Sequence, residues 1–327
     1  MNQSVTFKHF SSGLGRPQIL LIGNGLEKKS GQASWERLLD QLTVEDSLPI
    51  SREQKECIPF PLLYQILSTH MVDGVPHLNK ESILEEEHRL KDVMGRLMHK
   101  SNEFLDLLPS LNADHIFTTN YSYCIERAFF PSADFSKTHI RNYRRFRLNK
   151  PNSRQPNREN HYRLHTGYIA KSLERSTGIW HIHGECTVPR GIVLSHDRYG
   201  RLLQRIEEVC RSQDYASLLA NPVIEREFTS WPELFLYGDI YILGLTLSEN
   251  EFDLWWLLRR KQREYNADGS VFFYEPRPEN GFQEGRHLLF QVTGVKICDL
   301  GFKKSSDYDS FYRAALEDIR LRIAASR

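Results

Sequence analysis

The chain has 327 residues, 40% hydrophobic and 26% charged, a composition typical of globular rather than disordered proteins. Lysine and arginine total 43 against 42 acidic residues, so the net charge of +1 favours neither nucleic acid nor a membrane surface as a partner. No apolar run approaches the roughly 20 residues that cross a bilayer, and the N-terminus lacks the layout of a signal peptide. We therefore expect a cytoplasmic protein without membrane contact.

The cysteines are few and scattered. No two of them are closer than 24 residues, which excludes the paired spacing of a zinc ribbon. An odd number of separated cysteines is typical of reduced thiols in a cytosolic protein. The five are Cys57, Cys124, Cys186, Cys210 and Cys298.

Hydrophobic periodicity predicts strands that alternate with helices. The expected strands span residues 18–22, 115–120, 180–184, 191–195, 239–244, 270–275 and 295–300. The expected helices span residues 34–42, 59–72, 83–110, 124–129, 197–237 with an interruption at Pro222, and 306–324. One further helix is expected after Ser248, which is predicted to form a capping box with Glu251. This order predicts an α/β fold with a Rossmann-like, mostly parallel sheet and helices on both faces.

We expect one domain over residues 1–327 with two insertions and no zinc module. The first insertion, residues 45–112, is helical. The second, residues 131–179, is basic and lies between two strands of the sheet. Within it, residues 137–175 contain 11 basic and 2 acidic residues, a local charge of +9, so the rest of the chain sums to −8.

Parallel sheets bind ligands at the carboxyl ends of their strands, and several strand ends here carry glycines or polar residues. Residues 23–25 (Gly-Asn-Gly) follow the first strand, where glycines let the backbone approach a diphosphate and present N–H groups to it. Residues 118–121 (Thr-Thr-Asn-Tyr) follow the second strand. Asn120 can either cap a helix or hold a substrate hydroxyl or an attacking water.

Later strand ends add further candidates. His183 ends its predicted strand beside a glycine, and its near-neutral pKa suits a general base, although a structural role is common for a lone histidine. Gly244, Thr246 and Ser248 precede the predicted helix, a position suited to phosphate or ribose or simply to a capped helix. Glu275 ends another strand, where it can bind ribose hydroxyls or lie at the surface.

The order of these motifs is more specific than any one of them. GNG, TTNY, HG, IVLS-x-x-x-Y and ILG-x-x-LS follow one another between residues 18 and 275. This order resembles the sirtuin-like family, most closely the bacterial branch of silent-information-regulator-like NAD hydrolases found in anti-phage defence. The resemblance implies that Asn120 and His183 are catalytic. It also implies NAD⁺ contacts from Gly23, Asn24, Gly25, Thr119, Ser122, Gly244, Thr246, Ser248 and Glu275.

Two departures from the family pattern bear on function. The family usually has Asp where this chain has Ser122, so nicotinamide recognition is expected to differ. Deacylating sirtuins carry a four-cysteine zinc module, and here the basic insertion occupies that place. The resemblance therefore implies hydrolysis of NAD⁺ to nicotinamide and ADP-ribose without a metal. A non-catalytic sensor of NAD⁺ or ADP-ribose and, as a weaker case, a protein deacylase are the alternatives.

An enzyme that destroys NAD⁺ must be restrained in a living cell. We therefore expect a homo-oligomer, a partner defence subunit, or both. Nucleic acid is expected only through a partner or through residues 137–175, where Tyr143, Phe146 and Tyr162 stand among the basic residues.

Overall fold

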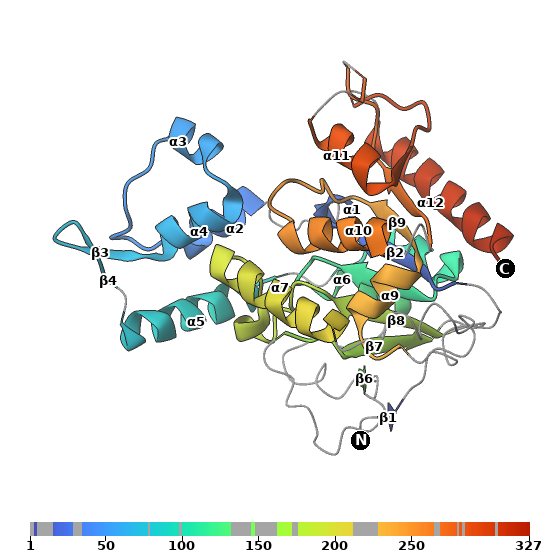
Figure 1. Ribbon diagram of the computed structural model, residues 1–327. Coiled ribbons are helices and arrows are strands. Elements are labelled where there is room, and N and C mark those ends of the chain that lie inside the picture. The colour runs from blue at the N-terminus through green and yellow to red at the C-terminus, as the bar shows by residue number, and fades with distance from the viewer. Residues whose placement is uncertain are drawn as a thin grey trace.

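The computed structural model describes residues 3–4, 16–28, 35–77, 79–97, 100–131, 145–147, 162–171, 176–211, 228–264, 269–279, 281–282, 285–304 and 307–327. Figure 1 shows a central sheet between two layers of helices, with a helical lobe extending to one side. The described residues contain no helix long and apolar enough to cross a membrane.

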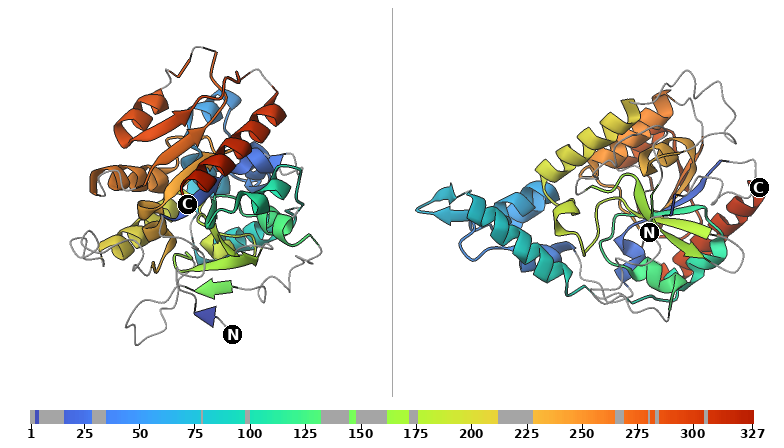
Figure 2. Two further views of the ribbon diagram at one scale, coloured as in Figure 1. Left: turned by 90° about the vertical axis from the view of Figure 1, so that its right-hand side faces the viewer. Right: turned by 90° about the horizontal axis from the view of Figure 1, so that it is seen from below.

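Within the described residues, the sheet has nine strands in the order β1-β6-β7-β8-β5-β2-β9-β10-β11. Figures 1 and 2 show the sheet from three directions. Its parallel centre consists of β2 (Gln18–Ile22), β5 (His115–Thr118), β8 (Ser176–His181), β9 (Asp239–Leu243), β10 (Val271–Tyr274) and β11 (Val295–Cys298). At one edge, β7 (Thr166–Lys171) runs antiparallel to β8 and to β6 (Arg145–Arg147), which pairs with β1 (Gln3–Ser4). Strands buried on both faces explain continuous apolar runs such as QILLI.

Numbered along the chain, the six parallel strands lie in the spatial order 3-2-1-4-5-6, the order of a doubly wound dinucleotide-binding sheet. The strand order reverses between β2 and β9, which are paired from Gln18 and Asp239 to Ile22 and Leu243. Ligands of such sheets bind in the crevice outside the carboxyl ends at this switch point. The predicted Rossmann-like α/β fold is confirmed.

Alternate residues of each strand enter opposite cores. Leu20 and Ile22 of β2 pack with η3 (Leu105–Leu111), α6 (Cys124–Phe129) and α12 (Tyr308–Ala325), whereas Ile19 and Leu21 pack with the helices of the other face. Those helices are α7 (His196–Arg211), α9 (Trp231–Tyr237), α10 (Phe252–Glu264) and α11 (Gly285–Thr293). The sheet is thus covered on both sides.

The lobe beside the sheet follows α1 (Asn24–Glu27) in the chain. It consists of α2 (Trp35–Leu42), α3 (Arg52–Cys57), α4 (Phe60–Ser68), the hairpin β3 (His70–Val72) and β4 (Val75–His77), and α5 (Lys80–Met94). The hairpin occupies part of a segment predicted as helix. The division into one domain with insertions at 45–112 and 131–179 stays a prediction.

Several predicted elements differ from those observed. Strand β8 ends at His181, two residues before His183. Residues 191–195, predicted as a strand, form none: Gly191 ends the short 3₁₀ turn η5 (Pro189–Gly191), and residues 192–195 are irregular. The Val193 N–H donates to the His183 carbonyl oxygen (2.9 Å). Strands β6 and β7 and the start of β8 lie inside the predicted basic insertion. Ser34 and Pro222 lie outside the described residues.

Candidate functional site

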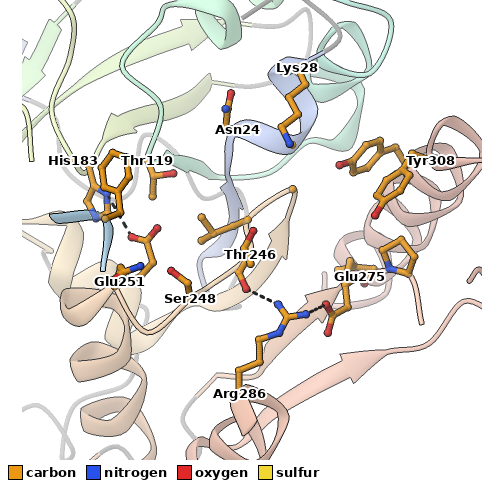
Figure 3. A pocket seen from close by; sticks show the side chains of 18 of the residues that line it. Asn24, Lys28, Thr119, His183, Thr246, Ser248, Glu251, Glu275, Arg286 and Tyr308 are labelled. Atoms are coloured by element: carbon orange, nitrogen blue, oxygen red, sulfur yellow. Dashed lines mark hydrogen bonds and ion pairs between the residues drawn. The ribbon is translucent and has the colours of Figure 1, made fainter. Parts of the chain in front are cut away.

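A cavity of about 460 Å³ opens at the carboxyl ends of the central strands (Figure 3). Its size is in the range of small-molecule sites. Eight of the eleven predicted site residues line it: Asn24, Gly25, Thr119, His183, Gly244, Thr246, Ser248 and Glu275. The other three, Gly23, Asn120 and Ser122, are buried and are not part of its lining.

His183 stands at one end of the cavity, opposite the first turn of α10. Its Nε2 lies 3.0 Å from Oδ2 of Asp253, and its Nδ1 lies 3.7 Å from Oε2 of Glu251. The His183 side chain is 3% exposed and the Asp253 side chain is 0% exposed. Burial alone lowers the pKa of His183, but the neighbouring Asp253 and Glu251 carboxylates raise it above its ordinary value overall. Asp253 therefore orients the imidazole and stabilises its protonated form.

Sequence analysis did not identify Asp253, and it interpreted Glu251 as part of a capping box. That interpretation is wrong, because α10 begins only at Phe252. The main-chain N–H of Glu251 instead donates to the Ser248 carbonyl oxygen (3.1 Å) in the turn before the helix. Asp253 therefore lies in the first turn of α10, and from there its side chain reaches His183. The sequence feature that could have indicated this residue is the pair of acids, Glu251 and Asp253, at the start of α10.

His183, Glu251 and Asp253 also have the composition of a metal site. Their ligand atoms lie within 4.8 Å of one another. One imidazole and two carboxylates are ligands that zinc and other transition metals accept. The hydrogen bond between His183 and Asp253 accounts for the cluster without an ion, and the absence of a metal stays a prediction.

The glycine turn after β2 is used differently from the prediction. The N–H of Gly23 donates to the Leu243 carbonyl oxygen (3.1 Å), and that of Gly25 donates to the Gly244 carbonyl oxygen (2.7 Å). These two N–H groups are therefore not presented to a diphosphate. A Cβ atom at Gly25 would lie 2.8 Å from Cα of Gly244, so the glycines allow the loops after β2 and β9 to pack closely.

Side chains near the glycine turn provide the polar groups that can face a ligand. Asn24 and Lys28 line the cavity on the side of the glycine turn (Figure 3). Lys28 is exposed, so its ammonium group can approach a ligand phosphate at little desolvation cost. These two residues are the groups through which this turn can contact a phosphorylated ligand.

The loop after β9 has an unusual backbone. Gly244 has φ of +69°, and Leu247 has φ of +49° although it is a fully buried residue with a branched side chain. Such a conformation costs on the order of 1–3 kcal/mol and is most common at functional sites. The Ser248 carbonyl oxygen accepts a hydrogen bond from Nε1 of Trp255 (2.8 Å), which fixes the loop to α10.

Glu275 at the far end of the cavity is held by two neighbours. Its Oε2 accepts a hydrogen bond from Arg286, and its Oε1 lies 2.5 Å from Nε2 of His287. Arg286 also donates to the Thr246 carbonyl oxygen (2.6 Å; Figure 3). Glu275 thus holds the Arg286 side chain in place. The sequence had predicted a different role for Glu275, a carboxylate that binds ribose. Arg286 brings positive charge to this end, and Lys304 is a further cation of the cavity lining.

Asn120 and Ser122 belong to a buried polar network beneath the cavity. The Asn120 carbonyl oxygen accepts a hydrogen bond from Nδ1 of His181 (2.8 Å), whose Nε2 lies 2.8 Å from Oε1 of Glu126. The Ser122 hydroxyl donates to Oε2 of Glu27 (2.6 Å). A carboxyl group therefore lies beside position 122, but it comes from Glu27 of α1, which sequence analysis did not identify.

The strand order and the position of the cavity are those of a doubly wound α/β protein with a small-molecule site at its switch point. A family model described as SIR2-like domain matches residues 114–289, which is more than half of the chain. The chain therefore belongs to the SIR2-like family, in which NAD⁺ is used and NAD-dependent enzymes occur. No curated protein matches the chain significantly.

Proposed function

We propose that the protein hydrolyses the bond between nicotinamide and ribose in NAD⁺, giving nicotinamide and ADP-ribose. The observation that best supports this chemistry is the buried pair of His183 and Asp253 at one end of the switch-point cavity. We further propose that the protein acts in the cytoplasm as an NAD-depleting effector of anti-phage defence.

The distribution of charge along the cavity supports one orientation of the substrate. Lys28 lines the cavity beside the glycine turn, and Arg286 lines it away from His183 (Figure 3). We propose that Asn24 and Lys28 contact the diphosphate and that the adenosine end lies near Arg286. The nicotinamide ribose then faces His183 and Thr119. In this orientation the Lys28 ammonium group offsets negative charge of the diphosphate.

The residues of the chain account for the proposed steps. Nicotinamide leaves with the electrons of the bond to the anomeric carbon, and that carbon passes through an oxocarbenium-like state before water attacks it. His183 accepts a proton from the attacking water, and Asp253 stabilises the imidazolium that results. Asn120, next to Thr119 of the cavity wall, is proposed to orient the water and the ribose. No metal takes part in this scheme.

A non-catalytic sensor of NAD⁺ or ADP-ribose is the second candidate. The observation in its favour is that Asn120 and Ser122 are buried and are not part of the cavity lining. A sensor requires only the cavity and its cations. Tight binding of NAD⁺ without nicotinamide release would favour this role over hydrolysis.

The test is chromatographic analysis of products from NAD⁺ with purified wild-type protein, Asn120→Ala and His183→Ala. His88→Ala is the matched control, because His88 is an exposed residue of α5 that does not line the cavity. We expect nicotinamide and ADP-ribose from the wild type and the control and neither product from the two site variants. Wild-type rates in Asn120→Ala or His183→Ala would refute the assigned roles.

We also propose that a homo-oligomer or a partner defence subunit restrains this activity. The basic stretch 137–175 is the proposed contact with that partner or with nucleic acid, on the basis of its charge of +9. Turnover per protomer that changes with protein concentration would support control by self-association. Binding of RNA or DNA that weakens steeply with salt would support contact with nucleic acid.

A further inference from the structure

Glu27 is a buried acid that the proposed reaction does not use. It is the last residue of α1, two positions after Gly25 of the glycine turn, and is 1% exposed. Its Oε2 accepts the hydrogen bond from Ser122. The Asn120 amide lies near enough to lower the pKa of this carboxyl group, as a hydrogen-bond donor does. Glu27 therefore adjoins one of the two proposed catalytic side chains.

Two buried atoms at this contact complement each other. Among the described residues, Oε1 of Glu27 and Nδ2 of Asn120 have no hydrogen-bond partner of ordinary geometry. One is an acceptor and the other a donor, and leaving either of them buried and unpaired is destabilising. A small movement of either side chain that pairs these atoms therefore removes both penalties.

We propose that Glu27 is a positioning residue that determines which way the side-chain amide of Asn120 points; this inference rests on the proposed hydrolase function. An ionised carboxylate can only accept hydrogen bonds, so it attracts Nδ2 and leaves Oδ1 for water or a ribose hydroxyl. A protonated carboxyl group can instead donate to Oδ1 and turn the amide over. The proton on Glu27 thus selects between two orientations of Asn120.

The surroundings of Glu27 allow both protonation states near neutral pH. Burial raises its pKa from 4.5 to about 7, while the hydrogen bond from Ser122 and the nearby Asn120 amide act to lower it. The charge of His181 lowers the pKa further, and that of Glu126 raises it. The active orientation of Asn120 is therefore populated increasingly as pH rises through neutrality.

The first test does not depend on turnover. Protein labelled with nitrogen-15 in asparagine is titrated from slightly acidic to slightly alkaline pH, and the Asn120 side-chain signal is assigned by its loss in Asn120→Ala. We expect the signal to shift with a midpoint near pH 7 in the wild type and to stay constant in Glu27→Gln, which cannot ionise. A constant wild-type signal, or the same shift in Glu27→Gln, would overturn the proposal. Loss of the shift in Glu126→Gln but not in Glu27→Gln would assign it to the His181 pair and would also overturn it.

The second test separates positioning from support of the fold. Glu27→Gln imitates the protonated acid, so at about pH 8 we expect kcat to fall on the order of 10²-fold, as small misplacements of reacting groups cause. The variant removes a buried charge, so its thermal stability at that pH should rise. A merely structural role would make activity and stability fall together. If the wild type releases no nicotinamide, the hydrolase proposal fails, while the titration still decides the role of Glu27.

Discussion

His183 and Asp253 are 70 positions apart in the chain, yet the imidazole and the carboxylate lie 3.0 Å apart and are both buried. The pair forms where the chain beyond β8 meets the first turn of α10. A buried carboxylate that accepts a hydrogen bond from a histidine fixes its tautomer and ring orientation. Several properties of the site follow from this contact.

Replacing Asp253 with Asn should slow turnover and change its pH dependence. The amide keeps the shape of the carboxyl group but removes the charge that stabilises imidazolium, so we expect kcat to fall on the order of 10²-fold or more. Because Asp253 raises the pKa of His183, the rising limb of the pH–rate profile should move to lower pH in the variant. Glu251→Gln, which alters the more distant carboxylate, should shift the same limb less. Equal shifts in the two variants would contradict this assignment.

The burial of Glu27 should make the protein less stable as pH rises. Its folded-state pKa of about 7 lies above the ordinary value of 4.5, so the native state binds this proton more tightly than the unfolded chain. The resulting stability is complete below about pH 4.5 and is lost as pH rises through 7. Relative to the wild type, Glu27→Gln should gain roughly 2.5 kcal/mol in free energy of unfolding between about pH 5 and pH 8. Urea unfolding at both pH values measures this difference, and an unchanged difference would show that Glu27 is ionised in the folded protein.

Gly25→Ala should destabilise the protein. The added methyl group would lie 2.8 Å from Cα of Gly244 and 2.7 Å from the Tyr312 hydroxyl oxygen, so the two loops must separate. We expect a loss of about 1–3 kcal/mol in free energy of unfolding. Gly200→Ala is the control, because a Cβ there meets no atom within 4 Å and helix α7 should gain stability from alanine. Similar unfolding midpoints for both variants would rule out close packing as the reason for Gly25.

Lys28→Ala should weaken binding of NAD⁺ without slowing the chemical step. Lys28 lines the cavity at the glycine turn, away from His183 (Figure 3). We expect KM to rise about fivefold to tenfold at low ionic strength and the difference to shrink with added salt, as screening reduces the attraction. Lys100→Ala, at an exposed position that does not line the cavity, serves as the control. A fall in kcat with KM unchanged would place Lys28 at the reacting end instead.

Much of the fold was predictable because the central strands are short apolar runs that end in glycine or polar residues. β2, β5 and β9 lie where the sequence indicated, and eight predicted site residues share the cavity as a result. Strand β7 was not predicted, because its residues Thr166–Lys171 mix polar and apolar types within a basic stretch.

Asp253 and Glu27 could not be identified from the sequence, and the physical reason is the same for both. Asp253 and Glu27 each contact a partner far away in the chain, 70 residues away for Asp253 and 95 for Glu27. Locally, Asp253 is typical of a first helical turn, and Glu27 precedes two lysines as a surface acid does. Only the folded chain buries these two carboxyl groups and places them beside His183 and Ser122.

The loop that follows β9 extends across the whole site. Arg286 donates a hydrogen bond to the Thr246 carbonyl oxygen of this loop, and Trp255 donates one to the Ser248 carbonyl oxygen. The loop then leads into Glu251 and Asp253, whose carboxylates face His183. The adenosine end and the reacting end of a bound dinucleotide would therefore touch one continuous piece of backbone, residues 244–253. In the proposed orientation of the substrate, recognition of its adenosine half and reaction at its other half would both depend on this single segment.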